Sequence, residues 1–257
     1  EQWDNTSWTE VGDMSTARGR AAAAGTSSSA FCAAGATPGA TTGVNNTEEW
    51  DHTSTLAAGA WASGGTFPVS AKERVAGAGT QTAALSVAGT NPGGNYSDDC
   101  LEYDGSSWTA NPNAFPATNF GLWGTGTATA ALIFGGRLSP GSLSAEAYTF
   151  NGTSFSAVND MNTARYYLGG AGTSTASVAF GGSLLPGNSD ASEEFDGTNW
   201  AEGDDLNTAR HSGAGTGTQT AGLAMGGSPA QTTVEEYNGS SWTSVTGTPV
   251  ATQTQSA

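Results

Sequence analysis

The sequence has very few positive charges. Seven lysine and arginine residues stand against 23 aspartate and glutamate residues, and Lys72 is the only lysine among 257 residues. The formal net charge at pH 7 is −16. Because proteins that bind nucleic acid neutralise phosphates with clustered lysine and arginine, this balance predicts that nucleic acid is not a partner.

Cysteine and histidine are almost absent. The two cysteines, Cys32 and Cys100, are too few for a disulfide framework and are typical of small buried apolar residues. The two histidines, His52 and His211, offer neither the spacing of a metal site nor a Ser-His-Asp arrangement. We therefore expect no enzymatic activity and no cofactor.

Long apolar runs are also missing. No stretch approaches the roughly 18 apolar residues of a membrane span, and no basic-then-apolar leader opens the chain. We expect no membrane insertion. Because residue 1 is glutamate, we also expect that the chain is processed or belongs to a longer repeat protein.

Glycine, in contrast, is abundant and periodic. There are 38 glycines, and a glycine pair, or its second glycine alone, recurs after a short apolar run at steps of 54, 47, 46 and 45 residues. The recurring positions are Gly35, Gly89, Gly135-Gly136, Gly181-Gly182 and Gly226-Gly227. A period in this range predicts stacked or radial repeats.

Each repeat has a hydrophobic period of two and is punctuated by Asp-Gly or Asn-Gly turns, with no helical spacing. This pattern predicts an all-β chain of four-stranded antiparallel units, at about 18–55, 74–108, 120–155, 165–200 and 210–242. Sheets this rich in small residues bury their faces when they are arranged radially, as in a β-propeller. Aromatic residues would fill the outer space between blades, at Trp8, Trp108, Phe155, Trp200 and Trp242.

The order arginine, apolar run, Gly-Gly, acidic strand, aromatic, turn and Trp resembles the kelch repeat over nearly the whole chain. The arginines are Arg18, Arg165 and Arg210, and the third unit has Asn119 instead. The resemblance implies a propeller whose double glycines close the second strands. The Ala/Gly/Thr-rich, lysine-poor composition is similar to kelch-like arrays of marine phage structural and tail-fibre proteins, which implies a role in host attachment.

The number of blades depends on the two ends. Residues 1–11 resemble the last two strands of another unit, and residues 246–257 resemble the beginning of a first strand. We expect a single propeller domain over 1–257 with six blades, the last closed by both termini, and five blades as the alternative. An incomplete sixth blade, a longer array, or a strand supplied by another chain remains open.

The recurring charged residues have a structural interpretation. One member of each acidic pair, such as Glu193-Glu194, is expected to meet a repeat arginine, and the other to face solvent. Asp98-Asp99 and Asp204-Asp205 could hold Ca²⁺, but no EF-hand pattern surrounds them, so we expect no metal.

Functional residues are expected in the connections that vary between repeats. These are the second-to-third-strand and blade-to-blade connections, together with an insertion around Leu56–Ala60. The candidates for ligand binding there are Trp61, Phe67, Tyr96 and Arg137. Packing of the same side chains against the blades is the alternative.

We therefore expect a non-enzymatic, extracellular or virion-associated module that binds a host-surface glycan or protein, or other virion proteins. The alternatives are a secreted carbohydrate-active enzyme and a cellular surface module for protein–protein interaction. Glycan arrays, product release and pull-downs distinguish them.

Overall fold

The computed structural model describes residues 2–3, 8–9, 11–19, 21–26, 28–37, 43–51, 60–70, 72–229 and 233–245. Within these ranges the chain forms β-strands and no helix, which confirms the predicted all-β class. No helix in this part of the chain could therefore cross a membrane. The chain divides into two compact units, residues 1–120 and 121–257.

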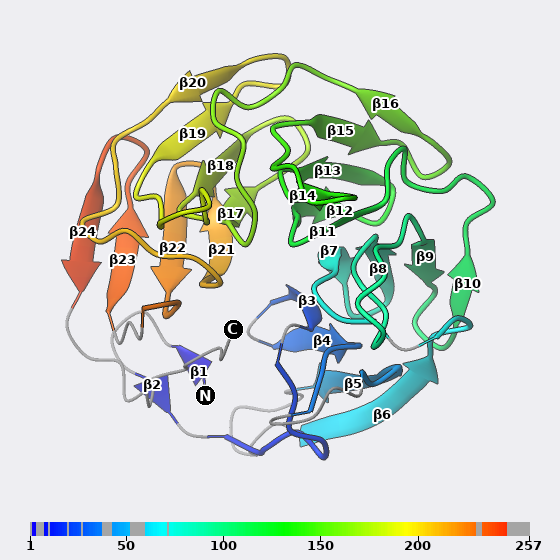
Figure 1. Ribbon diagram of the computed structural model, residues 1–257. Helices are drawn as coiled ribbons and strands as arrows, with labels where there is room; N and C mark the ends of the chain where they lie inside the picture. The colour runs from blue at the N-terminus through cyan, green and yellow to red at the C-terminus, as the bar shows by residue number, and fades with distance from the viewer. Residues whose placement is uncertain are drawn as a thin grey trace. The chain divides into compact units, whose positions relative to one another are not determined.

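The first unit contains two four-stranded antiparallel sheets, each with its strands side by side in chain order (Figure 1). The first sheet consists of β3 (Ala22–Gly25), β4 (Ser29–Ala33), β5 (Asn46–Asp51) and β6 (Ala60–Thr66). The second consists of β7 (Ala76–Thr80), β8 (Ala83–Val87), β9 (Cys100–Tyr103) and β10 (Trp108–Ala110). The short β11 (Asn119–Phe120) ends this unit.

The second unit contains three more sheets of the same kind (Figure 1). The third sheet consists of β12 (Trp123–Thr127), β13 (Ala130–Phe134), β15 (Ala147–Phe150) and β16 (Phe155–Ala157), with the short β14 (Arg137–Leu138) in its central connection. The fourth consists of β17 (Gly169–Gly172), β18 (Ser177–Phe180), β19 (Ser192–Phe195) and β20 (Trp200–Glu202). The fifth consists of β21 (Ala214–Thr218), β22 (Ala221–Met225), β23 (Val234–Tyr237) and β24 (Trp242–Val245).

Among the described residues, five sheets form the blades of a β-propeller, which is the five-blade alternative and not the six blades expected first. The predicted sixth blade is represented by β1 (Gln2–Trp3) and β2 (Trp8–Thr9), a two-stranded sheet. In it Trp3 pairs with Trp8, the same five-residue spacing as Tyr237 with Trp242. The expected contribution of residues 246–257 lies outside the described residues.

Small side chains allow neighbouring blades to approach closely. In the second unit β17 lies between β12 and β21, and in the first β3 lies beside β7. A Cβ atom on Gly215 would lie 2.4 Å from the carbonyl oxygen of Gly170, well inside contact distance. Glycine at these positions of β17 and β21 is therefore required by packing.

The recurring glycine pair turns the chain after each second strand. Gly181 has φ +63° and Gly182 has φ +110°, both in the left-handed region that favours glycine. The first and second repeats reach the same conformation with alanine, at Ala34 and Ala88, each with φ 60°. The backbone conformation is thus kept where the sequence pattern is incomplete.

Most of the insertion expected around Leu56–Ala60 lies outside the described residues. Its last residue, Ala60, is the first residue of β6. In register, Trp50 of β5 pairs with Trp61 of β6, as Tyr103 pairs with Trp108. Trp61 therefore has the same register position in its strand as Trp108.

Candidate functional site

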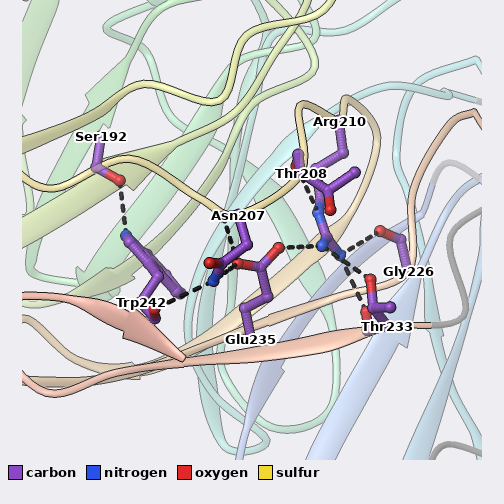
Figure 2. A network of polar contacts seen from close by, with 8 residues as sticks. All are labelled: Ser192, Asn207, Thr208, Arg210, Gly226, Thr233, Glu235 and Trp242. Atoms are coloured by element: carbon purple, nitrogen blue, oxygen red, sulfur yellow. Dashed lines mark hydrogen bonds and ion pairs between the residues drawn. The ribbon is translucent and has the colours of Figure 1, made fainter. Parts of the chain in front are cut away.

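The repeat arginines belong to buried polar networks. Arg210 and Glu235 form an ion pair and are 2% and 0% exposed (Figure 2). Nη1 of Arg210 also donates to the carbonyl oxygens of Gly226, at 3.1 Å, and Thr233, at 3.0 Å. Glu235 in turn accepts the backbone N–H of Asn207 at 2.6 Å. The network ties the end of the second strand to the third strand, as predicted for a scaffold role.

The same ion pair recurs in other repeats. Arg18 meets Glu48 at 2.6 Å, and Arg165 meets Glu193 at 3.1 Å. Burial is the main influence on the second pair: it raises the pKa of the Glu193 carboxyl and lowers the pKa of the Arg165 guanidinium. These groups are held in place away from solvent and are poorly suited to contact a ligand.

Lys72 takes the arginine position in the second repeat, which the interpretation of the sequence had not identified. Its ammonium lies 2.5 Å from Asp99. Burial of Asp99 is outweighed by hydrogen bonds from Lys72 and Ser97, so its pKa is lowered. Asp99, named above as a candidate Ca²⁺ ligand, thus has a lysine as its partner. The described residues contain no group of three His, Cys, Asp or Glu side chains able to hold a metal ion.

The outer aromatic residues bridge neighbouring sheets. The indole of Trp108 donates to Thr47 at 2.8 Å, and the hydroxyl of Tyr237 donates to Glu194 at 2.5 Å. Phe134 and Trp200 pack edge to face with ring centroids 5.1 Å apart. Glu194, the second acidic residue of its pair, therefore has a structural partner where solvent exposure was expected, whereas Glu236 is exposed as expected.

The four predicted ligand residues do not come together. Phe67 is 4% exposed, and its ring packs against Trp108 with centroids 4.7 Å apart, as in the alternative of a loop packed on the blades. Tyr96 is partly exposed and packs edge to face on Phe120. Trp61 lies in β6, whereas Arg137 lies in a second-to-third-strand connection.

Arg137 belongs to a group of five partly exposed residues in the second unit, here called the tyrosine cluster. Its members are Arg137, Tyr166, Tyr167, Asn188 and His211. All five lie in second-to-third-strand or blade-to-blade connections, where recognition residues were expected. The guanidinium of Arg137 lies 5.7 Å from the centroid of the Tyr166 ring. The ring of Tyr167 lies 4.4 Å from Tyr166 and is stacked at 6.2 Å with His211.

The backbone holds Tyr167 in an unusual conformation. Its φ is 55°, in the left-handed region, which a bulky residue adopts only at a cost of about 1–3 kcal/mol. Its N–H donates to the carbonyl of Gly121, and its own carbonyl accepts from Ser212, both at 2.7 Å. A Cβ on Gly121 would lie 3.0 Å from the Tyr167 ring, so glycine there leaves room for the tyrosine.

Asn188 fixes the protonation of His211. Nδ2 of Asn188 donates to the carbonyl of Ser228 at 3.0 Å, so its Oδ1 faces Nδ1 of His211 at 2.8 Å. Because Oδ1 can only accept, Nδ1 carries the proton and Nε2 holds a lone pair. Burial lowers the pKa of His211, which favours this neutral form.

Sequence reasoning missed Tyr166, Tyr167, Asn188 and His211 as a group. One signal was available: the residue after the repeat arginine is Gly19, Tyr166 or His211 in different copies. The residue type at this position differs between copies, although the arginine before it is the same in these copies. Asn188 carried no such signal, because its connection varies throughout.

The comparisons with known proteins show the fold alone. No family model matches the chain, and no curated protein matches it. Among solved structures, 219 chains match. One, titled "Structure of YjhT", is 11% identical, covers 89% of this chain and 84% of its own length, and has a TM-score of 0.73. The chain has a β-propeller fold.

Proposed function

We propose that this chain is a non-enzymatic recognition module that binds a surface glycan through the tyrosine cluster. In this proposal the protein is extracellular or belongs to a virion, and its role is host attachment. Its kelch-like repeat, which resembles those of phage tail fibres, supports this role. Other virion proteins are further partners in this proposal. It needs no metal or cofactor, and its net charge of −16 makes nucleic acid a poor partner.

The tyrosine cluster is the observation that carries this proposal. Three partly exposed rings, those of Tyr166, Tyr167 and His211, lie together in connections that differ between repeats. Elsewhere the aromatic residues Phe67 and Trp108 are buried between strands, where they stabilise the blades. Exposed aromatic rings with polar groups beside them are typical of ligand sites.

The carboxylates support a binding role over a hydrolytic one. A glycosidase needs two carboxyl groups that face a shared substrate. Glu193 is paired with Arg165, and Glu194 accepts the hydroxyl of Tyr237. The recurring acidic pairs therefore serve the scaffold.

A protein partner is the second candidate. Leu184 and Leu185 are 36% and 46% exposed in the connection between β18 and β19. The same connection contains Asn188 of the tyrosine cluster. Exposed leucines are the kind of residue that protein interfaces cover.

A glycan array followed by mass spectrometry of the recovered ligand tests the proposal. We expect selective binding and a ligand of unchanged mass. Release of a hydrolysed or oxidised product would replace the proposal with a carbohydrate-active enzyme. Capture of one host-surface protein, unaffected by deglycosylation and lost in Leu184→Ser/Leu185→Ser, would favour the protein partner.

A further inference from the structure

The tyrosine cluster offers two kinds of contact side by side. The rings of Tyr166 and Tyr167 provide aromatic surface, whose faces carry partial negative charge and attract polarised C–H groups. Nε2 of His211 provides a hydrogen-bond acceptor, because Asn188 holds the proton on Nδ1. A ligand that fits both has an apolar face and hydroxyl donors at its edge.

The single cation of the cluster is already engaged. Nε of Arg137 donates to the carbonyl of Gly141 at 2.8 Å, and its guanidinium lies over the Tyr166 ring. The hydrogen bond from Nε occupies the side of the guanidinium that would grip an anion through Nε and Nη together. The whole chain carries a net charge of −16, which also disfavours an anion.

The backbone at Tyr167 indicates that the ring has a purpose beyond the fold. The equivalent positions in the neighbouring repeats hold Gly121 and Ser212, with φ 68° and 57°. The same hydrogen bonds therefore form without a large side chain. A strained tyrosine that the blade does not need is typical of a ligand contact.

Resting on the proposed function, we infer that the tyrosine cluster binds one neutral sugar ring. The C–H face of the sugar lies on Tyr167, and one of its hydroxyl groups donates to Nε2 of His211. Arg137 holds the Tyr166 ring in place and makes no charged contact with the ligand.

Binding of neutral methyl glycosides to the full chain, by saturation-transfer NMR and calorimetry, tests this inference. In Tyr167→Gly the ring is lost and the backbone strain is relieved, so we expect affinity to fall about tenfold or more while the fold is kept. Ser212→Gly is the matched control, because it relieves the same left-handed position without removing a ring. It should bind within about twofold of the wild type.

His211→Phe keeps a ring but removes the acceptor, and it should also lower affinity about tenfold. Wild-type affinity in Tyr167→Gly, or equal losses in Tyr167→Gly and Ser212→Gly, would overturn the inference. Array binding restricted to anionic glycans, with no neutral glycoside bound, overturns it and leaves the proposed function standing. No binding to any surface glycan overturns both.

Discussion

The indole Nε1 of Trp242 donates a 2.8 Å hydrogen bond to the hydroxyl of Ser192 in the neighbouring sheet (Figure 2). Both residues are buried, so the bond closes the space between the third strand of one blade and the fourth strand of the next. One blade earlier, Trp200 stands in the same position, but Ala147 takes the place of the serine. The Nε1 of Trp200 is buried without a hydrogen-bond partner.

We expect Ala147→Ser to stabilise the protein by about 1 kcal/mol, because it gives the Trp200 indole an acceptor. Ser192→Ala is the matched control and should cost about 1–3 kcal/mol, since it leaves the Trp242 indole unpaired. Urea unfolding monitored by tryptophan fluorescence measures both changes. A loss of stability in Ala147→Ser would show that the site lacks room for a hydroxyl.

Truncation of Trp200 separates its packing from its polar group. Trp200→Ala removes a ring that is 7% exposed and packs on Phe134 and Phe195, and should cost about 3–5 kcal/mol. Trp200→Phe keeps most of the ring and loses an N–H that has no partner, so it should cost less than about 1.5 kcal/mol. Chemical unfolding curves give both values. A cost below about 1 kcal/mol for the alanine variant would contradict the inter-blade position.

The raised pKa of Tyr103 predicts that the folded protein loses stability at alkaline pH. Burial, and then the hydrogen bond that its hydroxyl donates to Glu49, raise its pKa from 10.0 to about 12. The folded protein therefore keeps the phenol proton while the unfolded chain loses it. The resulting stabilisation is complete below pH 10 and disappears as the pH rises toward 12.

In melting experiments from pH 8 upward we thus expect the melting temperature to fall steeply above about pH 10. Tyr103→Phe should start lower and show a shallower fall, because Tyr237 and other tyrosines remain. An unchanged alkaline slope in Tyr103→Phe would refute the assignment to this residue.

Exchanging glycine and alanine in the left-handed turn after the second strands should affect stability differently in the two directions. Gly181 has φ +63°, and a Cβ there would lie 2.6 Å from the carbonyl oxygen of Arg210. Gly181→Ala should cost about 2–4 kcal/mol. Ala88→Gly relieves the same strain at φ 60° and should change stability by less than about 1 kcal/mol. Thermal unfolding of the two variants measures both changes. A large cost for Gly181→Ala with little change for Ala88→Gly would show that the space for a Cβ, and not the left-handed conformation alone, requires glycine at position 181.

The blade structure could be predicted because it repeats. The glycine pairs, the Asp-Gly turns and the outer tryptophans each occur several times, so an irregular copy is recognised from the others. The pattern failed where one copy is interrupted. Trp61 was placed in a loop because residues 52–59 separate it from the strand with which its own strand pairs.

The tyrosine cluster was harder to predict because it depends on side chains from several connections. Arg137 was identified, since it follows a glycine pair. Its contact with Tyr166 depends on how two connections cross, which no local pattern encodes. Phe67 lies in a blade-to-blade connection, as expected, and its ring turns inward to fill the core, as in the packing alternative.

The backbone hydrogen bonds at Tyr167 have a consequence for evolution. Ser212 donates to Tyr167, and Tyr167 donates to Gly121, through main-chain atoms alone. The position is thus occupied by glycine, tyrosine or serine in successive blades with the same contacts. Side chains there can be exchanged by mutation without loss of these hydrogen bonds, so related chains could acquire new binding preferences while the blades stay unchanged.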